Sequence, residues 1–200
     1  MAMLLGQILP EFTGHAVLAT GGVDFEFNLS KYRAGRPAVL FFYAMNFSYV
    51  CPTELLALAN RVKALQERNF ATIAIACEHH LSHLEWRRQN LAEGGIGAAP
   101  FPLIADSNRE IAKNYGVLVN GAVAARACFI ADADGYVRFA HYYDFPFGRN
   151  LDEITRCADM LLHHQKTAQL CPAGWQAGHR GLLPSRSDIN QYLAVNAPNL

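Results

Sequence analysis

Hydrophobic and polar positions divide the first part of the chain into strand-like segments. Residues 23–29 (VDFEFNL) alternate between apolar and polar side chains, and residues 15–20 (HAVLAT) precede them across the glycine pair 21–22. Alternation on both sides of a glycine pair predicts a β-hairpin. Residues 37–43 (PAVLFFY) and 70–77 (FATIAIAC) are continuous apolar runs, typical of strands buried on both faces of a sheet.

The spacing of apolar residues becomes helical directly after Cys51. Pro52 and Glu54 are residue types that suit a first helical turn. One face of this predicted helix carries Leu55, Leu58, Ala59, Val62 and Leu65.

Further along, helical and strand patterns alternate. Residues 79–90 predict a short helix, and a loop over 93–102 follows it. Ser107 and Glu110 form a capping box for a helix that Gly116 closes. Two strands, 125–132 and 136–143, meet at the turn Asp134-Gly135. The last core helix opens at residue 150, and its apolar stripe consists of Leu151, Ile154, Cys157, Ala158, Leu161 and Leu162.

This order of elements predicts an α/β protein with a mixed central sheet flanked by helices. A thioredoxin-like fold is the natural member of that class, with an N-terminal hairpin and an extended C-terminal arm. We expect a domain over residues 1–165 and an arm over 166–200, because the tail is rich in Pro, Gly and Asn and shows little periodicity. The arm is expected to be flexible.

Composition and charge argue against a nucleic-acid partner, a secretory signal and a membrane span. The chain has 200 residues, 52% hydrophobic, with 17 basic and 17 acidic side chains. A net charge near zero argues against nucleic acid as a partner. The first basic residue is Lys31, so the start lacks the positive region of a secretory signal. The longest uncharged run, 37–53, contains Asn46, Ser48 and Pro52, which predicts a strand and a loop and no membrane span.

Five widely spread cysteines form an odd set in a chain long enough to fold without a disulfide framework. That usage predicts a reducing compartment, and we expect the cytoplasm. Cys77, Cys128 and Cys157 lie in apolar segments and are expected to be core residues.

Cys51 lies between an apolar strand and a helix, in the segment FSYVCPTEL. A helix N-terminus offers unpaired N–H groups and partial positive charge, which favour the nucleophilic thiolate, and Ser48 has a hydroxyl within reach of the sulfur. A structural cysteine that happens to begin a helix is an equally good interpretation of the placement alone. Cys171, in the turn LCPAGW outside the core pattern, favours the reactive interpretation, since a tail thiol is suited to resolving an oxidised cysteine elsewhere.

Five segments in order, FFYAMNFSYVCPTEL, HLSHLEW, EGGIG, FPFGR and CPAGW, resemble the typical two-cysteine peroxiredoxins, the alkyl hydroperoxide reductase C and thioredoxin peroxidase group. The resemblance covers nearly the whole chain. It implies that Cys51 is the peroxidatic cysteine and Cys171 the resolving one. It also implies that Arg126 lies beside the reactive sulfur, and that Glu54 and Arg149 hold Arg126 in place. Tyr43, just ahead of the active loop, is expected close to the site.

The resemblance further implies a reaction and partners. Cys51 attacks a hydrogen peroxide or alkyl hydroperoxide and becomes a sulfenic acid, the surrounding helix unwinds, and Cys171 of a partner subunit forms an intersubunit disulfide. A thioredoxin-like protein or a flavoprotein disulfide reductase then restores both thiols. The implied assembly is a homodimer that associates into a ring of five dimers, and the chain needs no metal, haem or flavin.

The active loop departs from the family pattern at two positions. The family has threonine where this chain has Ser48, which keeps the hydroxyl, and proline where this chain has Ala44. Losing the proline ring predicts an active site that is more open or more mobile, with turnover retained.

Three other functions are alternatives to a peroxidase. A thiol–disulfide oxidoreductase usually carries C-x-x-C at the helix start, whereas position 54 here is glutamate. A cysteine hydrolase would need a histidine near Cys51 in space, and nothing in the sequence supports one. A ring-forming holdase chaperone is a third alternative, which a Cys51→Ser variant would separate from the peroxidase.

Two groups of residues invite a ligand-binding interpretation. His79, His80 and His83 share a predicted helix, but no second cluster obviously completes a metal site, so a structural hydrogen bond is the preferred role for His83. Trp86 and Trp175 are expected to be packing anchors.

Overall fold

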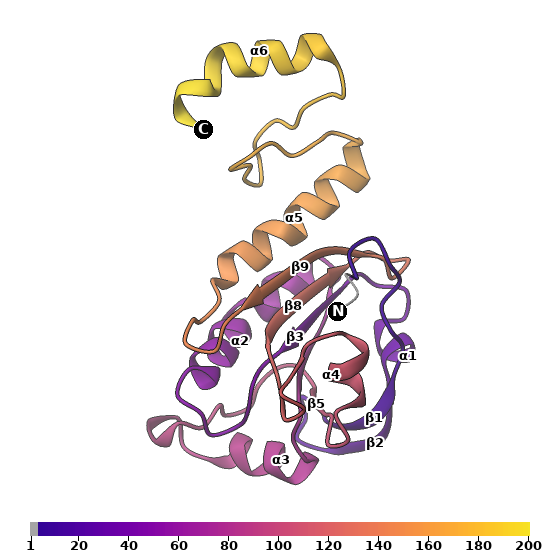
Figure 1. Cartoon of the computed structure of the whole chain (residues 1–200), viewed down its shortest axis with the longest axis vertical. Coiled ribbons are helices and arrows are strands. Elements are labelled where there is room, and N and C mark those ends of the chain that lie inside the picture. Colours follow the sequence, from indigo (N-terminus) through magenta and orange to yellow (C-terminus); the bar gives the residue numbers. More distant parts are fainter. Residues whose placement is uncertain (1–3) are drawn as a thin grey trace. The chain divides into compact units, whose positions relative to one another are not determined.

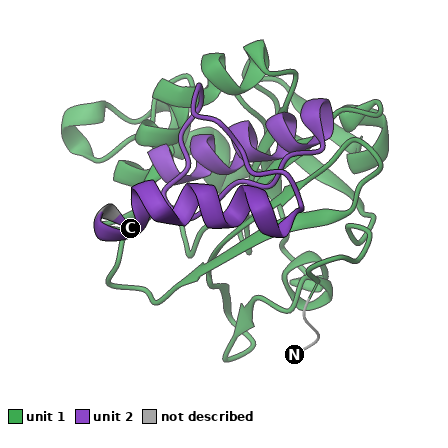
Figure 2. Ribbon diagram, turned by 90° about the horizontal axis from the view of Figure 1, so that it is seen from above, with its two compact units in different colours: residues 1–151 green, residues 152–200 purple. Residues whose placement is uncertain are grey.

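The computed structural model describes residues 4–200 and contains two compact units that divide after Leu151 (Figure 2). The sequence places its boundary after residue 165. The difference is one helix, Leu151–Thr167, which groups with the tail.

Within the described residues, unit 1 is built on a mixed sheet of seven strands in the order β2-β1-β5-β4-β3-β8-β9 (Figure 1). β3 is parallel to β4 and β4 to β5, and the remaining neighbours are antiparallel. The strands of this sheet are β1 Thr13–Val17, β2 Val23–Asn28, β3 Ala38–Phe42, β4 Ala71–Ala76, β5 Leu103–Ala105, β8 Arg126–Ala131 and β9 Val137–Tyr143. A separate two-stranded ladder pairs β6 Leu118–Val119 with β7 Val123–Ala124.

The structure confirms the two predicted hairpins and the two continuous apolar strands. Gly135, at the β8–β9 turn, has φ 92°, a conformation that glycine adopts without a steric penalty. The sequence pattern does not predict β5, because its three residues follow directly on a predicted loop. It is nevertheless fully buried between β1 and β4.

The helices of unit 1 connect and cover the strands. They are α1 Leu29–Arg33, α2 Cys51–Glu67, α3 His80–Arg88, the 3₁₀ turn η1 Leu91–Glu93 and α4 Glu110–Asn114. α4 lies in front of the sheet in Figure 1 and α2 behind it. Leu40 and Phe42 of β3 pack in the cluster that includes Ile111 of α4. Val39 and Phe41 alternate with them and face the other side of the sheet, and they are buried as well.

The predicted capping box of α4 is wrong. The Ser107 hydroxyl donates to Glu78 O, 3.0 Å away, and does not cap the helix. The Asp106 carboxylate accepts from the backbone N–H groups of Ile111 and Ala112 at 3.0 and 2.7 Å instead. An aspartate at the end of β5 therefore supplies the cap, since its two oxygens satisfy two free N–H groups at the helix start.

Unit 2 consists of α5, Leu151–Thr167, a long connection and α6, Arg186–Asn196, which ends in the 3₁₀ turn η2, Ala197–Asn199. The connection is tied together by the bridge between Leu170 and Leu182. The Asp188 carboxylate accepts from Leu183 N and forms an ion pair with Arg180. The residue pattern alone does not predict α6. The expected flexibility of the arm stays a prediction.

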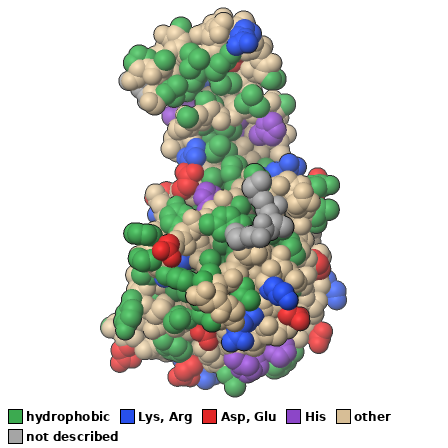
Figure 3. Space-filling model, in the orientation of Figure 1, with side chains coloured by type: hydrophobic (Ala, Val, Ile, Leu, Met, Phe, Trp, Pro, Cys, Tyr) green, Lys and Arg blue, Asp and Glu red, His purple; other side chains and the backbone are tan. Residues whose placement is uncertain are grey.

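Acidic and basic side chains are interspersed over the face shown in Figure 3, as equal numbers of the two would suggest. Across residues 4–200, no helix combines the length and apolar character that crossing a membrane requires.

Candidate active site

Cys51 is the first residue of α2 and directly follows the loop that connects β3 to this helix. Val50 precedes it as the N-cap, and Pro52 occupies the first turn. The sulfur is buried, with 0% of the residue exposed, and Nη1 of Arg126 donates to Sγ at 3.1 Å. The contact places a positive charge directly against a buried sulfur.

Glu54, one turn further along α2, holds two buried arginines. Its carboxylate accepts from Arg126 Nη1 at 2.7 Å and from Nε and Nη2 of Arg149 at 2.8 and 2.9 Å. The three side chains are at most 4% exposed. Burial alone would raise the pKa of Glu54, but the hydrogen bonds and charge of Arg149, together with the charge of Arg126, outweigh it and lower that pKa.

Arg126 has its own orienting contacts. Nε donates to Phe145 O at 2.8 Å, while Nη1 serves both Glu54 and the sulfur. Burial opposes the charge of this arginine. The hydrogen bond to Cys51 and the charges of Cys51 and Glu54 outweigh burial and raise the pKa of Arg126. The side chain therefore presents a fixed positive charge at Sγ.

Arg149 ties the ion cluster to the sheet. Its Nη1 donates to Phe42 O at 2.8 Å and to Ala127 O at 2.7 Å, which joins the ends of β3 and β8. The guanidinium carbon lies 3.4 Å from the centroid of the Phe41 ring. The structure thus brings Cys51, Glu54, Arg126 and Arg149 together, as the sequence resemblance implied.

A second polar network anchors the active loop, and it confirms the structural hydrogen bond predicted for His83. Tyr43 Oη lies 2.9 Å from Asn46 Oδ1 and 3.2 Å from His83 Nδ1, and all three residues are buried. His83 Nε2 lies 3.2 Å from Ile104 O, which can only accept, so Nε2 carries the proton and Nδ1 accepts. Asn46 Nδ2 donates to Ser82 Oγ at 2.7 Å. These bonds fasten the loop before Cys51 to α3 and β5.

Burial lowers the pKa of His83 from 6.5 to about 4. As pH falls through 6.5 the unfolded chain takes up a proton that the folded chain refuses, so stability is lost progressively between 6.5 and about 4. We expect the free energy of unfolding to be about 2 kcal/mol lower at pH 5 than at pH 7.5 through this group alone. Urea unfolding at several pH values measures it.

His83→Gln should flatten this dependence, whereas His164→Gln, at an exposed position of α5, should leave it unchanged. An unaltered slope in the His83 variant would contradict the assignment.

Ser48 and Ala44 both lie in the loop before Cys51. The Ser48 hydroxyl donates to Met45 O at 3.1 Å, so in this structure it is engaged by the loop backbone and not by the sulfur. Ala44 is 6% exposed. A site that is more open or more mobile than one with proline at this position stays a prediction.

A cavity of about 410 Å³ lies beside the loop. Arg126 and Ser48 supply polar atoms, and most of the wall is apolar. The remaining lining residues are Ala44, Met45, Tyr49, Val50, Val123, Phe145 and Pro146.

The other cysteines have different surroundings. Burial and the nearby Asp106 carboxylate raise the pKa of Cys77 to about 12, and burial with Glu153 raises that of Cys157 to about 12. Both therefore stay protonated at neutral pH. Cys128 and Cys157 are buried as predicted, whereas Cys77 is only partly buried, and Cys171 is partly buried in unit 2.

The two tryptophans and the histidine cluster can now be placed. Trp86 and Trp175 are 0% and 3% exposed, which confirms them as packing anchors. His80 stacks on His79 and makes an edge contact with His15 of β1. In the described part of the chain, no group of three or more His, Cys, Asp or Glu side chains has a metal-binding arrangement.

Cys51 begins a helix that follows a parallel strand of a mixed α/β sheet, and its sulfur contacts a fixed arginine. These features define the class of protein as a thiol enzyme with the thioredoxin fold. Comparison with known proteins narrows this class. The family model described as "AhpC/TSA family" matches residues 5–140.

Relatives extend the match over nearly the full length. Alkyl hydroperoxide reductase C of Helicobacter pylori (strain ATCC 700392 / 26695) is 38% identical over 198 residues, which cover 99% of this chain and 100% of the relative. Thioredoxin peroxidase of Echinococcus granulosus is 35% identical over 195 residues, which cover 97% of this chain and 100% of the relative. The reduced 2-Cys peroxiredoxin of Plasmodium vivax superposes with a TM-score of 0.93 at 34% identity, covering 96% of this chain and 100% of that one.

The chain belongs to the AhpC/TSA family of peroxiredoxins and is a thiol-dependent peroxidase. The fold is the thioredoxin-like fold that the sequence predicted.

Proposed function

We propose that Cys51 is the residue that reduces the peroxide and that Cys171 of a second copy resolves it. The role of Cys51 rests on the 3.1 Å contact between Arg126 Nη1 and Cys51 Sγ, because that contact places a fixed positive charge at one buried sulfur. The thiols of Cys77 and Cys157 have pKa values of about 12, stay protonated at neutral pH and are therefore poor nucleophiles.

In the first step the Cys51 thiolate attacks the terminal oxygen of a hydroperoxide. An S–O bond forms, the O–O bond breaks, and the departing oxygen takes a proton and leaves as water or an alcohol. Arg126 stabilises the negative charge that moves from sulfur to the leaving oxygen, and Glu54 with Phe145 O keeps the guanidinium aligned. Cys51 is left as a sulfenic acid.

Because Cys51 is fully buried, the sulfenic acid must become exposed before another thiol reaches it. We propose that the first turn of α2 unwinds and that Cys171 of the partner copy forms the disulfide. A thioredoxin-like protein or a flavoprotein disulfide reductase then reduces it. The relative named thioredoxin peroxidase supports a thioredoxin-like protein as the reductant. We also propose that the chain assembles into dimers, and that up to five dimers form a ring.

The apolar cavity beside the loop supports alkyl hydroperoxides as substrates alongside hydrogen peroxide. Its wall of Ala44, Met45, Val123 and Pro146 can take a hydrocarbon tail while the peroxide group meets Arg126. The name alkyl hydroperoxide reductase C of the bacterial relative agrees with this substrate class. We propose the cytoplasm as the location, because five widely spread cysteines and a thiol–disulfide cycle both suit a reducing compartment.

The decisive experiment treats reduced protein with one equivalent of hydrogen peroxide, blocks the remaining thiols, and analyses the product by non-reducing gel and peptide mass. We expect a covalent dimer joined through Cys51 and Cys171. Cys171→Ser should abolish that dimer, and the matched variant Cys157→Ser should retain it. Unmodified Cys51 after peroxide treatment would refute the proposal.

A further inference from the structure

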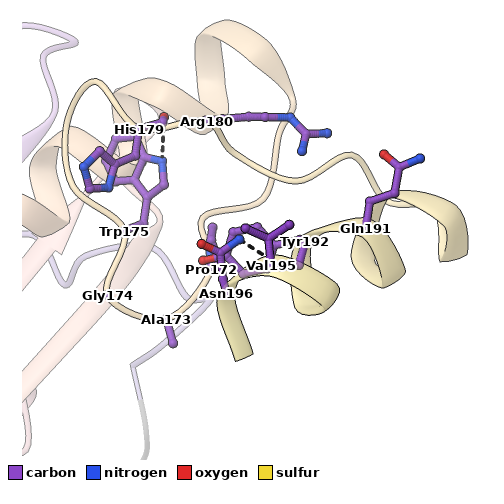
Figure 4. A pocket seen from close by; sticks show the side chains of 10 residues that line it. All are labelled: Pro172, Ala173, Gly174, Trp175, His179, Arg180, Gln191, Tyr192, Val195 and Asn196. Atoms are coloured by element: carbon purple, nitrogen blue, oxygen red, sulfur yellow. Dashed lines mark hydrogen bonds between the residues drawn. The ribbon is translucent and has the colours of Figure 1, made fainter. Parts of the chain in front are cut away.

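The turn that carries Cys171 is anchored within unit 2. The backbone N–H of Trp175 donates to Pro172 O at 3.1 Å and closes the turn, while Gly174 takes a φ of 68°. Figure 4 shows the buried Trp175 side chain, whose Nε1 donates to His179 O at 3.0 Å. The cysteine is therefore presented on an ordered turn.

One face of α5 holds this turn. Residues 156, 160 and 163 follow the i, i+4, i+7 spacing of a single helix face. Arg156 Nη1 donates to Trp175 O at 3.0 Å, the Cys171 thiol lies 3.8 Å from Met160 O, and the His163 ring lies 4.8 Å from the Trp175 ring. Three positions on one face thus contact both ends of the turn.

Arg156 is itself fixed before it reaches the turn. Its Nε and Nη2 donate to the two carboxylate oxygens of Glu153 at 2.6 and 2.7 Å. This bidentate pair leaves Nη1 directed at the turn carbonyl. Burial raises the pKa of the Cys171 thiol, and the charge of Arg156 acts against that rise.

We propose that Arg156 is a positioning residue for the resolving step: it clamps the Cys171 turn and supplies the positive charge that favours the attacking thiolate. The inference rests on the proposed role of Cys171. In that step the Cys171 thiolate attacks Sγ of the Cys51 sulfenic acid, an S–S bond forms and the S–O bond breaks. Hydroxide leaves and takes up a proton as water; Cys171 sulfur is oxidised and Cys51 sulfur is reduced.

The test separates peroxide reduction from disulfide formation by rapid mixing of the reduced protein with hydrogen peroxide. Arg156→Met removes both the hydrogen bond to the turn and the positive charge. We expect disulfide formation to be roughly tenfold slower, because one charge-assisted contact is lost. The rate of Cys51 oxidation should be unchanged. Arg156→Lys keeps the charge and should recover part of the rate. Arg88→Met is the matched control, because Arg88 forms an exposed i,i+3 pair with Glu85 at 4.0 Å on α3.

A pH profile distinguishes charge from simple loosening of the turn. Losing a positive charge should move the midpoint of the resolving rate to higher pH in Arg156→Met and leave it nearly in place in Arg156→Lys. A purely structural role would lower the rate equally at every pH. The titratable and charged groups around the turn are Glu153, Arg156, Cys157, His163, His179, Arg180 and Asp188.

The outcomes are distinct from those of the proposed function. If the unmodified protein forms no Cys51–Cys171 disulfide, the role of Cys171 fails and this inference fails with it. If that disulfide forms normally and Arg156→Met resolves at the same rate and midpoint, only the role of Arg156 is refuted. Slower Cys51 oxidation in Arg156→Met would also refute it. Near-ultraviolet circular dichroism, to which the buried Trp175 contributes, checks that each variant keeps the turn.

Discussion

Cys51→Ser is expected to lower peroxide turnover by more than about three orders of magnitude, because it removes the proposed nucleophile. A serine hydroxyl is far less acidic than a thiol, and the Arg126 contact at 3.1 Å cannot compensate for that difference. Serine differs from cysteine by one atom, so the buried position at the start of α2 should still be filled. Coupled turnover with hydrogen peroxide measures the loss, and far-ultraviolet circular dichroism confirms the fold.

Cys77→Ser is the matched control for this experiment. Its thiol, with a pKa of about 12, stays protonated and takes no part in the proposed reaction. Turnover should therefore stay close to that of the unmodified protein. Substantial turnover in Cys51→Ser, or its loss in Cys77→Ser, would assign the peroxide chemistry to another sulfur.

Glu54→Gln is expected to lower the free energy of unfolding by about 3–5 kcal/mol, because it removes the carboxylate charge that the buried Arg126 and Arg149 share. Glutamine has nearly the same shape as glutamate, so the loss would report charge and not volume. The arginine at the sulfur would also lose its alignment, and Cys51 oxidation should slow. Urea unfolding of the reduced protein gives the first number, and rapid mixing gives the second.

Glu85→Gln supplies the comparison for Glu54. Glu85 pairs with Arg88 at 4.0 Å, and both side chains are at least 70% exposed. Exposed pairs contribute about 0–1 kcal/mol, so this variant should unfold almost as the unmodified protein does. A Glu54 variant no less stable than the Glu85 variant would show that the buried ion cluster is not needed for stability.

The parts of the fold that the sequence predicted well are those with strong local patterns. The continuous apolar runs predict β3 and β4, and the helical spacing after Cys51 predicts α2, from local sequence alone. The ion cluster was located through resemblance, since no local pattern joins Glu54 to residues 72 and 95 positions away.

Other features depend on tertiary contacts that no local pattern shows. β5 has three residues and exists because β1 and β4 pair on both sides of it. The Tyr43–Asn46–His83 network joins the active loop to a helix 37 or more positions further on. The cap of α4 comes from Asp106, one residue before the serine that fits the sequence motif.

The place of Glu54 within α2 has a consequence for the opening that we propose. In the proposed mechanism the helix opens at Cys51 to release the sulfur, but three residues later the same backbone carries the carboxylate that Arg126 and Arg149 share. Opening beyond Thr53 would separate that carboxylate from two buried guanidinium groups, so the free energy of opening would rise abruptly there. The proposed opening would therefore be limited to the first turn, while the ion cluster holds the rest of the helix to the sheet.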